Sequence, residues 1–194
     1  MNYKPDKLVF ATKNKNKLAE VSNILKATGV LIHGIEGNFA PDETGETFEE
    51  NAYIKAYEAA KLTGMPALGD DSGLVVDALD GKPGVYSSRY AENDEKRIKK
   101  ILEELKNLPY EKRTARFICA MVVVNPDGKT LFSCKGVCEG KIIDILKGTN
   151  GFGYDPIFFI PEKNATMAEL TMEQKNTVSH RGKALKKIIE WLLN

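Results

Sequence analysis

Residues 117–138 have the sequence FICAMVVVNPDGKTLFSCKGVC, and this stretch decides the fold class. Two strand-like runs, Phe117–Val124 and Thr130–Cys138, are joined by Asn125–Gly128. The Asn, Pro, Asp and Gly of this joining segment are typical of a tight turn. The apolar run Ile118–Val124 predicts a strand that is buried in the sheet. We therefore expect a long β-hairpin, with further strands and helices on either side of it.

Strands and helices alternate before and after this hairpin. Before it, the pattern predicts a strand at Leu8–Ala11, a helix with Leu18, Val21, Ile24 and Leu25 on one face, and a strand at Val30–Ile32. A second helix is expected to begin at a capping box, Thr47–Glu50, and to end near Thr63. A strand–turn–strand at Met65–Val76 and a helix at Glu95–Leu108 follow. After it, we expect a strand at Ile157–Ile160 and a terminal helix at Gly182–Leu193. Strands separated by helices, together with a long hairpin, predict an α/β fold with a mixed sheet flanked by helices.

Composition limits the class of protein. The 194 residues include 28 basic and 27 acidic side chains, a net charge of +1, and 42% are hydrophobic. This length and balance predict a single globular domain over residues 1–194, either undivided or with two lobes. A protein that binds nucleic acid over its whole surface would carry a basic excess, so we expect no nucleic-acid partner. The longest apolar run, Phe117–Val124, has eight residues, far short of the roughly 20 that span a bilayer, so we expect no membrane partner.

The cysteines and the amino terminus indicate the compartment. Cys119, Cys134 and Cys138 are odd in number and form no Cys-x-x-Cys motif. The first residues, Met1–Lys7, lack the apolar stretch of a secretory signal. These features predict buried thiols in a reducing cytoplasm.

A polar turn between the first strand and the first helix is a candidate phosphate site. Such a turn presents backbone N–H groups and the positive end of a helix dipole, which together suit a phosphate. Its residues are Thr12, Lys13, Asn14, Lys15, Asn16 and Lys17. Lysines two apart in a turn cannot all point inward, so at least one is expected to face solvent. An exposed polar turn without a ligand is an equally supported alternative.

An acidic pair, Asp70-Asp71, lies between apolar runs, where Asp is disfavoured. Mg²⁺ is held by one or two carboxylates together with water and substrate phosphate, and this pair would supply them. In an extended chain, neighbouring side chains point to opposite faces, so one Asp of the pair would reach the metal directly. Glu43, in an acidic loop, is a candidate second ligand. The alternative is an Asx-type turn completed by Ser72 and Gly73.

Two further segments are candidates for contacts with a nucleotide. In the helix after Thr47, Asn51 and Lys55 share a face, and Lys55 would point at a phosphate or pair with Glu58 or Glu50 on the surface. The loop Gly151–Pro156 places Phe152 between two glycines, where the ring can stack on a nucleobase. Asp155 can accept a hydrogen bond from a base, and His180 and Arg181 can donate one to a carbonyl oxygen. A hairpin anchored in the core is the alternative for the Phe152 loop.

Together, these motifs resemble the family of inosine/xanthosine triphosphate pyrophosphatases, which remove deaminated purine nucleotides. The resemblance covers nearly the whole chain. It rests on Thr12–Lys17, Glu43–Gly45, Thr47–Ala56, Asp70–Leu74, Pro83–Tyr90, Gly151–Phe159 and Ser179–Gly182, in this order. One departure is Lys13, where many relatives have Gly.

The resemblance implies an elongated ITPase-like α/β fold with two lobes and a central substrate cleft, acting as a homodimer. It implies Mg²⁺-dependent cleavage of ITP, dITP and XTP between the α- and β-phosphates, which yields a monophosphate and pyrophosphate. The catalytic residues would be Asp71 as the base, Lys17 and Lys55, and the metal ligands would be Glu43 and Asp71. The substrate-binding residues would be Thr12, Lys13, Asn14, Lys15, Asn16, Lys17, Ser72, Phe152, Gly153, Tyr154, Asp155, Lys175, His180 and Arg181.

Two other functions compete with this one. A regulatory module would bind a nucleotide in the same way without hydrolysing it. A pyrimidine-nucleotide pyrophosphatase would share the architecture and need a different base pocket, and the Phe152 loop together with His180 and Arg181 argues against it.

Overall fold

The structure is a computed structural model that describes residues 4–194, apart from the side chains of residues 16 and 20. Its strands and α-helices are, in order, β1(Lys7–Phe10), α1(Lys15–Leu25), β2(Leu31–Gly34), α2(Phe48–Thr63), β3(Ala67–Val76), α3(Asp94–Leu105), β4(Thr114–Val124), β5(Thr130–Ile142), β6(Phe158–Ile160), β7(Ala165–Thr166), α4(Met172–Val178) and α5(His180–Leu193). Within the described residues, no helix is both long and apolar enough to cross a membrane.

The strands form one mixed sheet of seven strands, in the order β2-β1-β3-β4-β5-β6-β7. Strand β1 pairs in parallel with β2 and β3, whereas β6 pairs antiparallel with β5 and β7. The predicted α/β class with a mixed sheet is therefore confirmed. The chain divides into two compact units, the first comprising residues up to Asp71, 119–136 and 183–194, and the second comprising 72–118 and 137–182.

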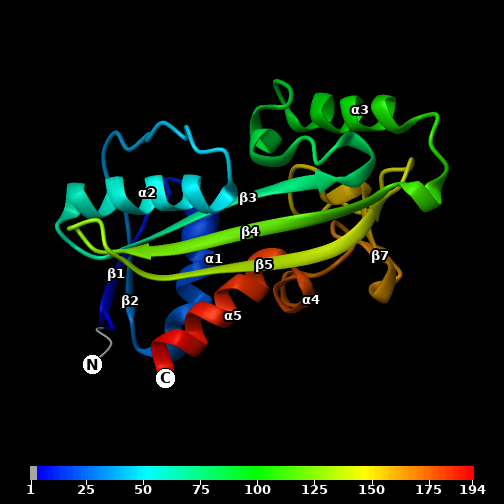
Figure 1. Ribbon diagram of the computed structural model, residues 1–194. Helices are drawn as coiled ribbons and strands as arrows, with labels where there is room; N and C mark the ends of the chain where they lie inside the picture. The colour runs from blue at the N-terminus through cyan, green and yellow to red at the C-terminus, as the bar shows by residue number, and fades with distance from the viewer. Residues whose placement is uncertain (1–3) are drawn as a thin grey trace. The chain divides into compact units, whose positions relative to one another are not determined.

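In the first unit, helices cover both faces of the sheet (Figure 1). Alternate residues of β1 point to opposite sides, as a strand requires. Leu8 and Phe10 pack in one apolar cluster with residues of α1 and α5, whereas Val9 and Ala11 pack in a second cluster with alanines of α2. The first unit is thus a three-layer arrangement, and α2 approaches its sheet through small side chains.

In the second unit, α3 packs its apolar face against the sheet. Ile98, Ile101 and Leu105 recur at helical spacing and are buried in one cluster with Phe117 and Phe158, among other side chains. Asn93 begins the helix, because its side-chain oxygen accepts a hydrogen bond from the N–H of Lys96 at 2.9 Å. Asp94 is the first residue of this helix.

The expected hairpin of β4 and β5 is confirmed, and the N–H of Gly128 closes its turn on the carbonyl oxygen of Asn125 at 2.9 Å. The capping box at Thr47 is also confirmed. The prediction of a strand–turn–strand at Met65–Val76 is wrong, because β3 runs unbroken through Asp70 and Asp71. Burial of two carboxylates inside a strand is tolerated here because each is paired with a lysine.

Candidate active site

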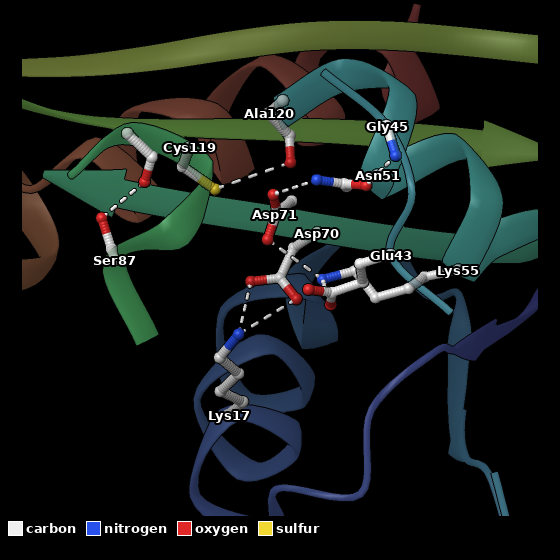
Figure 2. Close-up of polar contacts among 11 residues, drawn as sticks. Lys17, Glu43, Gly45, Asn51, Lys55, Asp70, Asp71, Ser87, Cys119 and Ala120 are labelled. Atoms are coloured by element: carbon white, nitrogen blue, oxygen red, sulfur yellow. Dashed lines mark hydrogen bonds and ion pairs between the residues drawn. The ribbon is translucent and has the colours of Figure 1, made fainter. Parts of the chain in front are cut away.

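Two adjacent aspartates of β3 point to opposite faces of the strand, each toward a lysine (Figure 2). Asp70 accepts hydrogen bonds from Lys17 Nζ of α1, at 3.0 Å and 3.3 Å to its two oxygens. Asp71 Oδ1 accepts one from Lys55 Nζ of α2 at 3.2 Å. The alternation of side chains expected for extended backbone is confirmed, and it assigns each carboxylate to a different helix.

Lys55 also contacts Glu43, so its ammonium group lies between two carboxylates. Its Nζ is 2.9 Å from Glu43 Oε1 and 3.2 Å from Asp71 Oδ1. Of the alternatives left open for Lys55, the surface pair with Glu50 or Glu58 is thus not the one that the described residues show: Lys55 points into the cluster. A cation held between Glu43 and Asp71 shows that these two carboxylates can share a positive charge. Both belong to the set predicted to bind a divalent metal.

The charges in this cluster shift the pKa of two of its members. Burial raises the pKa of the Asp71 carboxyl above its ordinary 3.8, and the negative charges of Glu43 and Asp70 raise it further, whereas Lys55 opposes the shift. Burial by itself lowers the pKa of Lys55, but the attraction of Asp70, Asp71 and Glu43 outweighs it and raises the pKa. Lys55 is thus a permanent cation at neutral pH.

Asn51 is a member of this cluster that the sequence analysis did not assign to the site. It is fully buried, its Nδ2 donates to Asp71 Oδ2 at 3.4 Å, and its Oδ1 accepts from the N–H of Gly45 at 2.8 Å. A Cβ on Gly45 would lie 2.8 Å from Asn51 Oδ1, so a larger residue would disturb this contact. Asn51 therefore ties the loop that carries Glu43 to Asp71. The signal in the sequence was an amide on the same helical face as Lys55.

Close packing of α2 on β3 brings Lys55 to Asp71. A Cβ on Gly69 would lie 2.1 Å from the carbonyl oxygen of Ala52 and 2.8 Å from the backbone nitrogen of Ala56. Both are backbone atoms of a helix, so neither can move aside as a side chain would. Only glycine at this position lets the helix approach so closely.

We expect Gly69→Ala to lower the free energy of unfolding by about 3 kcal/mol, because the added methyl forces α2 away from β3. Urea denaturation of the two proteins measures this. Gly29→Ala is the control. Gly29, unlike Gly69, has a positive φ, +74°, but nothing lies within 4 Å of the added Cβ, so only the backbone cost of about 1 kcal/mol is expected. Equal losses in the two variants would contradict the packing argument.

The predicted phosphate turn forms the start of α1. Asn14 Oδ1 accepts from the N–H of Lys17 at 3.1 Å, and Thr12 Oγ1 accepts from the N–H of Asn14 at 3.2 Å. Lys13 and Lys15 are exposed, as expected for at least one lysine of this turn, whereas Lys17 is half-buried against Asp70. The side chain of Asn16 lies outside the described residues.

The predicted base-binding loop lies in the second unit and presents the Phe152 ring to solvent. Phe152 is 58% exposed, whereas Tyr154 and Asp155 are buried. Asp155 Oδ2 accepts from the N–H of Phe152 at 3.0 Å and from Lys175 Nζ at 2.5 Å, and the same Nζ lies 5.2 Å from the centre of the Phe152 ring. The Tyr154 hydroxyl donates to the carbonyl oxygen of Ser87 at 2.9 Å. The conformation of the loop is thus fixed by Asp155, Lys175 and Tyr154. Gly153 directly follows Phe152 in the loop.

Three further predicted site residues lie in the interior of the second unit. The His180 ring stacks on Phe117, with ring centres 4.9 Å apart, and His180 and Arg181 are 7% and 4% exposed. The Ser72 Oγ is buried and has no hydrogen-bond partner within the part of the chain that the structure describes. A buried hydroxyl in this state favours a ligand or water as its partner.

The carboxylates of the first unit suit a hard divalent cation. Among the described residues, no group of three or more His, Cys, Asp or Glu side chains is arranged to hold a metal by itself. Mg²⁺ does not require such a group, because it keeps several waters and binds through one or two carboxylates and substrate phosphates. Glu43 and Asp71, which already share the Lys55 ammonium, match this donor set.

Known proteins are similar to this chain along nearly its whole length. The model of the Ham1 family matches residues 8–191. A dITP/XTP pyrophosphatase of Geobacter sulfurreducens is 54% identical over 187 residues, with 92% of each chain covered. A protein of the same name from Desulforamulus reducens is 50% identical over 192 residues, with 96% of this chain and 95% of the relative covered.

Solved structures show the same fold. A HAM1 protein from Coxiella burnetii has a TM-score of 0.88 and 43% identity, with 96% of this chain and 98% of that chain covered. The Ham1 protein of Staphylococcus aureus has a TM-score of 0.86 and 41% identity, with 96% and 97% covered.

Proposed function

The chain belongs to the Ham1 family, and we propose that it is a dITP/XTP pyrophosphatase: it hydrolyses ITP, dITP and XTP to the monophosphate and pyrophosphate and so removes them from the nucleotide pool. The names of relatives at 54% and 50% identity support this activity. On this chain, the proposal rests on the ion-pair cluster around the two buried aspartates of β3, which comprises Lys17, Asp70, Asp71, Lys55 and Glu43.

We propose Mg²⁺ as the cofactor, held by Glu43 and Asp71. The metal would orient a water and neutralise charge on the departing pyrophosphate. Support comes from the hard carboxylate donors and from the lysine cation that these two side chains already share. Asn51 contributes by fixing one oxygen of Asp71 and the loop that carries Glu43.

The protein's own groups have separate tasks in the proposed reaction. Asp71 accepts the proton of the attacking water, because a carboxylate positioned beside the water can act as a general base. Lys17 contacts the phosphates, and its pairing with Asp70 holds the ammonium group in place before substrate arrives. Thr12, Asn14 and the backbone at the start of α1 add neutral contacts to phosphate oxygens.

Base recognition falls to the residues of the second unit. Phe152 stacks on the purine, and Gly153, Tyr154, Asp155 and Lys175 shape the loop that presents it. Hypoxanthine and xanthine carry a 6-oxo group, which His180 or Arg181 would read as a hydrogen-bond acceptor. Adenine has an amino group there, so it would leave a buried donor unpaired, and such mismatches are rejected strongly. Ser72 is proposed to contact the substrate through its buried hydroxyl.

The proposal is tested by rates of pyrophosphate release from dITP, XTP, dUTP and GTP, with Mg²⁺ and with the metal chelated. Fast turnover of dITP and XTP that is lost on chelation supports it. Preference for dUTP favours a pyrimidine-nucleotide enzyme, and tight binding of dITP without turnover favours a regulatory module.

Phe152→Ala is expected to raise KM for dITP by roughly tenfold while kcat changes little, since stacking on a base contributes about 1–3 kcal/mol. Steady-state kinetics measure both constants. Tyr110→Ala is the matched control, because Tyr110 is also an exposed ring with a lysine nearby, Lys141 Nζ at 4.7 Å from its centre. An unchanged KM in Phe152→Ala would count against base stacking.

Two further properties are part of the proposal. We propose that the enzyme acts as a homodimer, as its resemblance to the family implies, so its mass in solution should be twice the 21.5 kDa of the chain. We also propose a cytoplasmic location, which the three free cysteines support, since a reducing compartment keeps thiols unpaired.

A further inference from the structure

The loop that carries Phe152 is held by two carboxylates on consecutive backbone N–H groups. Asp155 Oδ2 accepts from the N–H of Phe152 at 3.0 Å, and Asp94 Oδ2 accepts from the N–H of Gly153 at 2.8 Å. Asp155 belongs to the same segment of chain, whereas Asp94 comes from α3, 59 residues away in sequence. The peptide groups on both sides of the Phe152 Cα are therefore fixed, which sets the direction in which its exposed ring leaves the backbone.

Asp94 is itself firmly placed. It is the first residue of α3, directly after the Asn93 cap. Its other oxygen, Oδ1, accepts from Arg97 Nη1 at 2.6 Å, and Arg97 Nε donates to the carbonyl oxygen of Ala91 at 3.1 Å. Asp94 thus connects the start of α3 to the loop that carries Phe152. In this loop Gly153 has a φ of +62°, a left-handed conformation that glycine adopts readily, and the hydrogen bond from its N–H to Asp94 helps to hold it.

We propose that Asp94 is a positioning residue for base recognition: through the N–H of Gly153 it holds the Phe152 ring in the orientation that receives the purine. This inference rests on the proposed function, because it takes Phe152 as the stacking residue. Asp94 does not touch the substrate in this account. Its effect reaches the substrate only through the loop, so it should change nucleotide affinity rather than the chemical step.

The test compares Asp94→Ala with Glu95→Ala. Each removes one carboxylate from the first turn of α3, but Glu95 is exposed and has no part in the loop contacts described above. We expect Asp94→Ala to raise KM for dITP about tenfold with kcat within about twofold of the unchanged protein, and Glu95→Ala to change neither. Arg97→Met, which removes one of the contacts that place Asp94 and leaves the Gly153 contact itself, should raise KM less than Asp94→Ala does.

A second readout does not depend on activity. In ¹⁵N-labelled protein, the Gly153 amide should exchange with solvent much faster in Asp94→Ala than in Glu95→Ala, while thermal unfolding shows that both variants are folded. Equal KM values in Asp94→Ala and Glu95→Ala, or a Gly153 amide equally protected in both, would overturn the inference. The two proposals can fail separately. If the unchanged protein does not hydrolyse dITP, the proposed function is wrong. Faster exchange of the Gly153 amide in Asp94→Ala would still show that Asp94 binds this amide.

Discussion

Asp71→Asn is expected to lower kcat for dITP hydrolysis by about 10³-fold, the largest effect of any single substitution considered. A general base contributes about 10²–10⁴-fold, and an amide can neither accept the proton nor carry the charge that a cation requires. The change keeps the size of the side chain, and its oxygen can still face Lys55. Steady-state rates of pyrophosphate release, with circular dichroism to confirm folding, measure the loss.

Glu49→Gln is the matched control for this substitution. Glu49 is a carboxylate of α2 that pairs with Lys135 at 3.3 Å on the surface, away from the cluster around Asp71. An exposed pair contributes little, so kcat should stay within about twofold. A folded Asp71→Asn protein that retains more than a tenth of the original kcat would show that Asp71 is not the base.

Lys17→Met is expected to lower kcat by about 10²-fold and the free energy of unfolding by about 2 kcal/mol. The value of kcat falls because the Lys17 ammonium group, which would stabilise the negative charge on the phosphates in the transition state, is lost. The free energy of unfolding falls because Asp70, 1% exposed, is left as a buried carboxylate without the Lys17 ammonium. Steady-state kinetics and urea denaturation measure the two effects separately.

The double variant Lys17→Met/Asp70→Asn separates catalysis from stability. Removing the charge of Asp70 as well should restore most of the stability, because the buried negative charge that Lys17 neutralises is then absent. The loss of kcat should persist, since the phosphate contact is still missing. Recovery of kcat in the double variant would mean that Lys17 serves only to neutralise Asp70.

The sequence predicted the elements of the fold well where a pattern is local. The apolar run of β4, the turn at Asn125–Gly128 and the capping box at Thr47 each depend on neighbouring residues, and all three are confirmed. The prediction of a turn around Asp70 was wrong. It was based on the low strand propensity of Asp. What overrides that propensity is a lysine 53 residues away, which no local pattern contains.

For the site, residue types were predictable and partners were not. The sequence indicated that Asp70 and Asp71 diverge, but not that Lys55 would lie between Asp71 and Glu43 rather than against Glu58. For the loop after Gly151, the sequence predicted that Phe152 and Asp155 both contact a base, Phe152 by stacking and Asp155 by accepting a hydrogen bond. The structure exposes Phe152 and buries Asp155 against the loop's own backbone, a difference that depends on the tertiary contact with Lys175.

The most direct test of the central claim is ³¹P NMR of dITP incubated with the enzyme and Mg²⁺. We expect the unchanged protein to form dIMP and pyrophosphate in equal amounts, and Asp71→Asn to form neither in detectable amount over the same time. Release of dIDP with inorganic phosphate, or equal product formation by Asp71→Asn, would contradict it.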